Sequence, residues 1–110
     1  MVKSTIPEFI REEKPATETA DSIIEETARK YNVTVGDILG KSRRKDIKTA
    51  RNVAMYIIKR ILDMSFPAIG KMMDRDHSTV YSNIQAVEQE METNDKLANE
   101  ISEIIKEIKN

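Results

Sequence analysis

The apolar residues of segment 47–63 recur every three or four positions, the spacing of one face of an α-helix. This stripe consists of Ala50, Val53, Ala54, Ile57, Ile58, Ile61 and Leu62. The 110-residue chain has only three glycines and three prolines, and aromatic residues make up 5% of it. Because it lacks the valine, threonine and aromatic runs that build sheets, we expect an all-α protein with 47–63 as its central helix.

Two shorter helical segments precede this one. Thr19 is placed to cap a helix that runs to about Lys30. In the stretch TVGDILG, Thr34 and Asp37 have the spacing of a capping box, and Gly40 is expected to end the helix in a left-handed turn.

Three helical segments follow the central one. Ser65 can cap FPAIGKMM, where Pro67 is tolerated because it lies in the first turn. A longer helix is expected from Asp76 or His77 to about residue 92, and a last one after Asn94. The sequence therefore predicts a bundle of about five to six helices.

Residues 19–110 are expected to form one domain, preceded by a tether over residues 1–18. Pro7 and Pro15 interrupt that stretch, and most of its other residues are charged or polar. The chain has no cysteine, which excludes disulfides and thiolate metal sites. No apolar run approaches the length of a membrane span and no signal-peptide core follows Met1, so we expect a cytoplasmic location.

The net charge of −1 conceals an uneven distribution. Segment 41–60 holds eight lysines and arginines against one aspartate, whereas segment 88–110 holds seven acids against three bases. A basic segment in a near-neutral chain is typical of an anion-binding face. A solvated helix end beside a loop has the same composition, so charge alone leaves both interpretations open.

The stretch MDRDHSTV, residues 73–80, contains the only histidine, His77. A helix of about two turns, a break of three or four residues and a longer helix over 65–92 give a helix-turn-helix outline. The second helix of such a motif presents its first turn to base edges. Its residues here, Asp76 to Thr79, suit base recognition and also suit plain N-capping. The residues alone do not separate these alternatives.

Catalysis and nucleotide binding fit the sequence poorly. Consecutive Asp76, His77 and Ser78 at a helix start point in different directions, whereas a catalytic triad converges from separate parts of a fold. One histidine without cysteine gives no metal-ligand spacing. The stretch GDILGKS has three residues between its glycines where a P-loop needs four, and no strand precedes it. We therefore expect no catalytic residues, no metal and no cofactor.

Segment 70–84, GKMMDRDHSTVYSNI, resembles the signature of the C-terminal DNA-binding domain of the bacterial replication initiator DnaA. VGDILGKSRRKDI is similar to the family's short helix and basic loop. TARNVAMYIIKRILDMSFPAIG is similar to its long helix and the first helix of its helix-turn-helix. The resemblance covers roughly residues 19–92 and implies an all-helical fold of the Trp-repressor-like kind.

The resemblance also implies how the chain meets double-stranded DNA. In the major groove, bases and phosphates are approached by Arg75, Asp76, His77, Ser78 and Thr79. Arg43 is expected in the adjacent minor groove, where narrow A·T-rich geometry concentrates negative potential. Phosphates are expected to be neutralised by Arg44, Lys45, Lys48 and Arg51. The helix N-terminus at Ser65 and Pro67 can offer backbone N–H groups to a phosphate. The implied ligand is a short, asymmetric, A·T-rich element of the DnaA-box kind.

Two features depart from the family pattern. Asp74 stands alone where two glycines usually precede Arg-Asp-His, so the turn is one residue shorter. The family's ATPase domain and a complete Walker motif are absent from these residues, and an upstream ATPase domain is expected only in a full-length relative. A helix-turn-helix transcription regulator and a helical protein–protein adaptor remain alternative functions. Because the family's DNA element is not palindromic, we expect a monomer, with no membrane partner.

Overall fold

A computed structural model describes residues 19–109, which form six helices and, within that range, no strand. The helices are α1 (Ala20–Tyr31), α2 (Val35–Leu39), α3 (Lys45–Leu62), α4 (Phe66–Met73), α5 (His77–Met91) and α6 (Asp95–Lys109). The prediction of an all-α bundle is confirmed. The expected tether over residues 1–18 lies outside the described residues.

Most helices begin at the residue that the sequence predicts. The side chains of Thr19, Thr34, Ser65 and Asp76 each accept a hydrogen bond from a backbone N–H in the first turn of the helix that follows. The capping box between Thr34 and Asp37 is present in both directions. These caps satisfy donors that a helix start leaves without partners, and they fix where each helix begins.

Helix α3 begins earlier than expected, at Lys45 rather than near Ile47. Arg44 occupies the N-cap position without a side-chain cap, and its carbonyl accepts from the Lys48 N–H at 2.8 Å. The connection between α2 and α3 is therefore short. We call residues 40–44 the basic loop.

The expected left-handed turn at Gly40 is wrong. Gly40 has φ −86° and ψ −161°, which is extended backbone, and its N–H donates to the Asp37 carbonyl. Left-handed conformations occur instead at Asn32, Asp63 and Asp74, which end α1, α3 and α4. Asparagine and aspartate tolerate this conformation better than other non-glycine residues. In this domain it is therefore these residues, and not a glycine, that end helices in the left-handed conformation.

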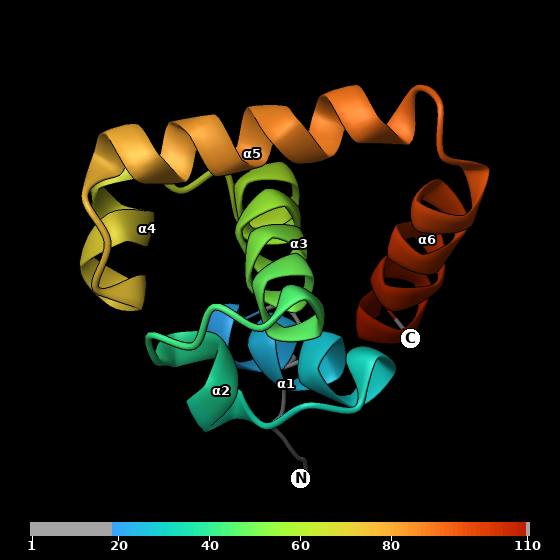
Figure 1. The fold of residues 1–110 in the computed structure, drawn as a ribbon, viewed down its shortest axis with the longest axis horizontal. Helices are drawn as coiled ribbons and strands as arrows, with labels where there is room; N and C mark the ends of the chain where they lie inside the picture. The colour runs from blue at the N-terminus through green and yellow to red at the C-terminus, as the bar shows by residue number, and fades with distance from the viewer. Residues whose placement is uncertain (1–18, 110) are drawn as a thin grey trace, which may run out of the picture.

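Helix α3 passes through the middle of the molecule (Figure 1). Its residues from Val53 to Ile58 are all buried, and it packs against α1 on one side and α5 on the other. Met55 and Tyr56 are ordinary core residues. Ile61 and Leu62, at the end of the predicted stripe, are only partly buried.

The outer helices divide the molecule into two ends. The basic loop, α4 and the first turn of α5 lie on the left in Figure 1, and α6 lies on the right, where it packs against α1. The acidic C-terminal segment is therefore at the opposite end from the basic loop. No helix within residues 19–109 is long and apolar enough to cross a bilayer.

Gly70 permits the close approach of α4 to the turn that follows it. A β-carbon at this position would lie 2.4 Å from the carbonyl oxygen of Arg75. The Gly70 carbonyl itself accepts a hydrogen bond from the Arg75 N–H at 2.8 Å. The turn is thus packed directly on the backbone of α4, and any side chain at residue 70 must push the two apart.

We expect Gly70→Ala to lower the free energy of unfolding by about 1–3 kcal/mol, because the added methyl group meets backbone that cannot rotate away. Gly36→Ala is the matched control, since a β-carbon there meets nothing closer than the Thr34 hydroxyl at 3.7 Å. The control should be neutral or more stable by up to about 1 kcal/mol. Urea denaturation followed by circular dichroism measures both, and equal stabilities for the two variants would contradict the packing argument.

Candidate nucleic-acid interface

Helices α4 and α5 and the three residues between them form a helix-turn-helix. Asp74 has φ 58° and ends α4, and Asp76 caps α5. Arg75, between them, is the residue whose N–H closes the turn on Gly70. The N–H groups of Asp74 and Arg75 both donate to the Gly70 carbonyl at the end of α4, and the Asp76 carboxylate accepts from the Ser78 N–H at the start of α5.

The first turn of α5 combines capping with exposure. The Asp76 carboxylate accepts from the Ser78 N–H at 2.8 Å and from the Thr79 hydroxyl at 2.9 Å. These hydrogen bonds, that from Thr79 foremost, lower the pKa of Asp76. Residues 76–79 are all exposed. The capping interpretation is therefore confirmed for Asp76, and the side chains of His77 and Ser78 remain accessible to a ligand.

Several exposed cations lie in the basic loop and at the start of α3. Arg43 and Lys48 are exposed, and so is Arg44, which pairs with the Asp46 carboxylate at 2.7 Å. Lys45, expected in the loop, lies in the first turn of α3. Basic side chains therefore cover both the loop and the helix that follows it.

Arg51 does not lie with these exposed cations. Its side chain is only 6% exposed, and its guanidinium donates to the carbonyls of Ile38 at 2.8 Å, Ser42 at 3.0 Å and Asp37 at 3.1 Å. Burial lowers the pKa of Arg51, and the nearby charge of Arg75 lowers it further. Three of its N–H groups thus donate to the protein, so Arg51 holds the basic loop against α3, and the phosphate contact expected from the sequence stays a prediction.

An open groove of about 700 Å³ separates the basic loop from the start of α5. Five of the predicted site residues border it, namely Arg43, Lys48, Arg51, Arg75 and Thr79. The other predicted residues lie outside its lining: Arg44, Lys45, Ser65, Pro67, Asp76, His77 and Ser78. The fold thus brings the loop and the helix-turn-helix to the two sides of one basic groove.

Sequence reasoning missed four residues of this groove: Lys41, Ser42, Asn52 and Asn83. Asn83 follows Thr79 by one helical turn, so helical spacing alone places it on the same face. Asn52 directly follows Arg51, and its buried Oδ1 has no hydrogen-bond donor among the described residues. The only sequence signal for Lys41 and Ser42 was their place in the basic loop.

An aromatic pair near the start of α4 was also missed. The rings of Phe66 and Tyr81 meet edge to face with centroids 5.2 Å apart, and the Lys59 ammonium lies 4.8 Å from the centre of the Phe66 ring. Tyr81 is 46% exposed, which is unusual for a large side chain with an apolar ring. The pair braces α4 against α5 and presents an apolar edge at the surface.

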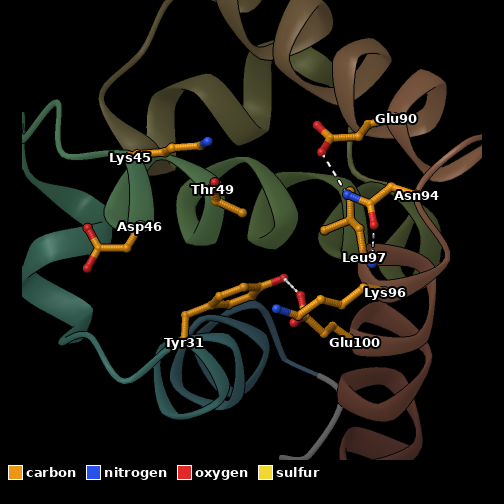
Figure 2. A pocket seen from close by; sticks show the side chains of 9 residues that line it. All are labelled: Tyr31, Lys45, Asp46, Thr49, Glu90, Asn94, Lys96, Leu97 and Glu100. Atoms are coloured by element: carbon orange, nitrogen blue, oxygen red, sulfur yellow. Dashed lines mark hydrogen bonds between the residues drawn. The ribbon is translucent and has the colours of Figure 1, made fainter.

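A second depression, of about 530 Å³, lies between α1, α3, α6 and the end of α5 (Figure 2). Two pairs of its polar side chains bond to each other: the Tyr31 hydroxyl donates to Glu100 at 2.9 Å, and the Asn94 amide donates to Glu90 at 3.0 Å. Burial raises the pKa of Tyr31, and the bond to Glu100 raises it further. These contacts join α6 to the rest of the bundle, so the depression has a structural role and offers no convergent reactive groups.

Fold and groove together define a helix-turn-helix domain with a basic loop beside its second helix. Residues 20–87 match the family model described as the bacterial DnaA protein helix-turn-helix. The chain belongs to this family. The expected resemblance is therefore confirmed over residues 20–87.

Several curated relatives are named chromosomal replication initiator protein DnaA. The chain is 33% identical over 103 residues to the chromosomal replication initiator protein DnaA 2 of Protochlamydia amoebophila, which covers 94% of the chain and 23% of the relative. It is 37% identical over 99 residues to DnaA of Neisseria meningitidis, covering 89% of the chain and 19% of the relative. The chain spans about a fifth to a quarter of the length of these relatives.

The Asp76 cap makes a pH-dependent contribution to stability. Because its pKa is lowered in the folded protein, the contribution is complete above the ordinary carboxyl pKa and is lost as the pH falls through the folded value. Asp76→Asn keeps a good capping group that does not titrate in this range. We expect the stability difference between the protein and this variant to shrink from pH 7 to pH 3, as measured by urea denaturation at each pH. A constant difference would exclude a titrating cap.

Proposed function

We propose that this domain binds double-stranded DNA as the site-reading module of a bacterial replication initiator. Helix α5 enters the major groove with its first turn, and the basic loop enters the adjacent minor groove. The ligand is a short, asymmetric, A·T-rich element of the DnaA-box kind, bound by one copy of the domain. Because the matched part of the family is its helix-turn-helix, the proposed activity is binding rather than catalysis.

The observation that carries this proposal is the shared groove. The exposed first turn of α5 and the exposed Arg43 flank a concave surface bordered by Lys41, Lys48, Arg51 and Arg75. A sugar-phosphate backbone is a continuous anion that separates a major from a minor groove. A protein that reads both grooves needs a basic concavity between its two reading elements, and that arrangement is present here.

The N-terminus of α4 supplies a second anchoring point beside α5. Ser65 and Pro67 are exposed, and the helix start is positive because its first N–H groups point outward along the axis. Pro67 and the half-buried Phe66 add apolar surface next to Tyr81. This corner suits a phosphate together with the methyl group of a thymine.

Selection of bound duplexes from a random library tests the function directly. We expect enrichment of one asymmetric A·T-rich element and 1:1 binding in sedimentation. Enrichment of a palindrome with two protein copies would favour a dimeric transcription regulator. Failure to bind any duplex at low salt would favour the protein–protein adaptor.

We expect His77→Ala to fold normally and to lose about 1–3 kcal/mol of preference for the selected site over a mutated one, because an exposed helix start contributes base contacts rather than core packing. Binding to random DNA should change much less, since phosphate contacts remain. Denaturation and titrations with both DNAs give the three quantities. Equal losses on both DNAs, or a clear loss of stability, would remove His77 from the base-reading residues.

Affinity should fall steeply with salt. Five exposed lysines and arginines lie in the loop and at the start of α3, namely Lys41, Arg43, Arg44, Lys45 and Lys48. If each neutralises one phosphate, the slope of log K against log salt should be roughly −4 to −5. Lys48→Ala should flatten this slope by about one unit. Lys109→Ala, the same charge change at the far end of α6, is the control and should leave the slope unchanged. A similar effect of both substitutions would mean that net charge, not the groove, controls binding.

A further inference from the structure

Two arginines donate hydrogen bonds to backbone carbonyls at the end of α2 and in the basic loop. Arg51 of α3 donates to the carbonyls of residues 37, 38 and 42, and Arg75 of the helix-turn-helix donates to the carbonyl of Gly40. The Gly40 carbonyl, bonded by Arg75, lies in the chain between the Ile38 and Ser42 carbonyls, which Arg51 bonds. The basic loop is therefore held from α3 on one side and from the α4–α5 turn on the other.

Arg75 is itself fixed by the turn from which it extends. Its Nη1 donates to the carbonyls of Met73 at 2.8 Å and Asp74 at 3.2 Å, while its Nη2 reaches Gly40. Three hydrogen bonds to backbone thus orient a planar guanidinium between two segments 35 residues apart. A lysine has the same charge but cannot offer this fixed set of donors.

The residue that departs from the family pattern strengthens the same link. The Lys41 ammonium donates to the Asp74 carbonyl at 3.1 Å and lies 3.2 Å from its carboxylate. Both side chains are largely exposed, so this ion pair contributes little by itself. It nevertheless joins the same two segments as Arg75, the start of the basic loop and the turn before α5.

We propose that Arg75 is a positioning residue that sets the place of Arg43 relative to the recognition helix α5. This inference rests on the proposed function, in which the loop and α5 read neighbouring grooves of one duplex. Without Arg75, the loop keeps its attachment to α3 through Arg51, and only the exposed Lys41–Asp74 pair still joins it to the turn before α5. Each minor-groove contact then costs conformational entropy, because the loop must become ordered when it binds. Arg75 acts through Arg43, rather than by reading a base itself.

Proteolysis of the free protein tests the clamp without DNA. Trypsin cleaves after lysine and arginine, so Lys41, Arg43 and Arg44 report how often the basic loop opens. We expect Arg75→Gln and Arg75→Lys each to speed cleavage within residues 41–44 by about tenfold at temperatures where circular dichroism shows a folded protein. Lys71→Gln, which removes an exposed charge from α4 that has no contact with the loop, should leave this rate unchanged.

A double-mutant cycle on the selected DNA element then tests the coupling. Arg43→Ala should weaken binding by about tenfold in the original protein and by less than about twofold in the Arg75→Lys background. The lysine variant distinguishes a phosphate contact by Arg75 from its positioning role. A lysine can still contact a phosphate, but it cannot replace the guanidinium that donates to three backbone carbonyls.

The two experiments have outcomes that overturn the inference separately from the function. Unchanged loop cleavage in both Arg75 variants, additive losses in the cycle, or rescue by lysine would remove the positioning role, as would unfolding of both variants at 25 °C. Absence of duplex binding by the original protein would instead reject the proposed function and with it the reading role of Arg43, while the cleavage rates still decide whether Arg75 holds the loop.

Discussion

A guanidinium can lie inside a small helical domain only where backbone or side-chain acceptors meet its N–H groups. Arg51 meets this condition through carbonyls at the end of α2 and in the basic loop, which α3 alone does not supply. The same bonds satisfy carbonyls at the end of a five-residue helix that has no C-terminal side-chain partners of its own. The buried charge and the short helix therefore stabilise one another, and the loop that follows is held at a defined place on α3.

Because α3 is also the central helix of the core, the hydrogen bond from Arg51 to the Ser42 carbonyl attaches the basic loop to the most tightly packed part of the domain. The residues that surround Arg51 in sequence, Ala50 and Val53 to Ile58, are buried against α1 and α5. Helix α5 packs on the same helix with Val80 and Ile84, while its first turn stays exposed. The basic loop and helix α5, the two candidate reading elements, are thus both attached to α3. A protein that contacts two grooves at once needs such a shared support, because it fixes the position of one element relative to the other.

Local signals in the sequence were sufficient for most of the fold and for part of the site. Caps at Thr19, Thr34, Ser65 and Asp76 and the 3.6-residue spacing of apolar side chains place the helices, because both are properties of neighbouring residues. The extended backbone at Gly40 and the burial of Arg51 escaped the sequence for one reason: both depend on where the basic loop is placed by residues far away in the chain. Charge predicts an exposed arginine, and only tertiary structure reveals that three carbonyls converge on Arg51.

The chemistry at the start of α5 explains why capping and recognition were hard to separate from sequence. Asp76 orders the first turn by accepting from Ser78 and Thr79, and that order fixes the direction in which His77 leaves the helix. A ligand that meets a side chain already held on a rigid turn loses less conformational entropy on binding than one that meets a frayed helix end. In the proposed function, the cap therefore prepares the contact of His77 rather than competing with it. A helix that begins with a capping carboxylate followed by exposed polar residues is stable at the end that must face solvent until the ligand arrives.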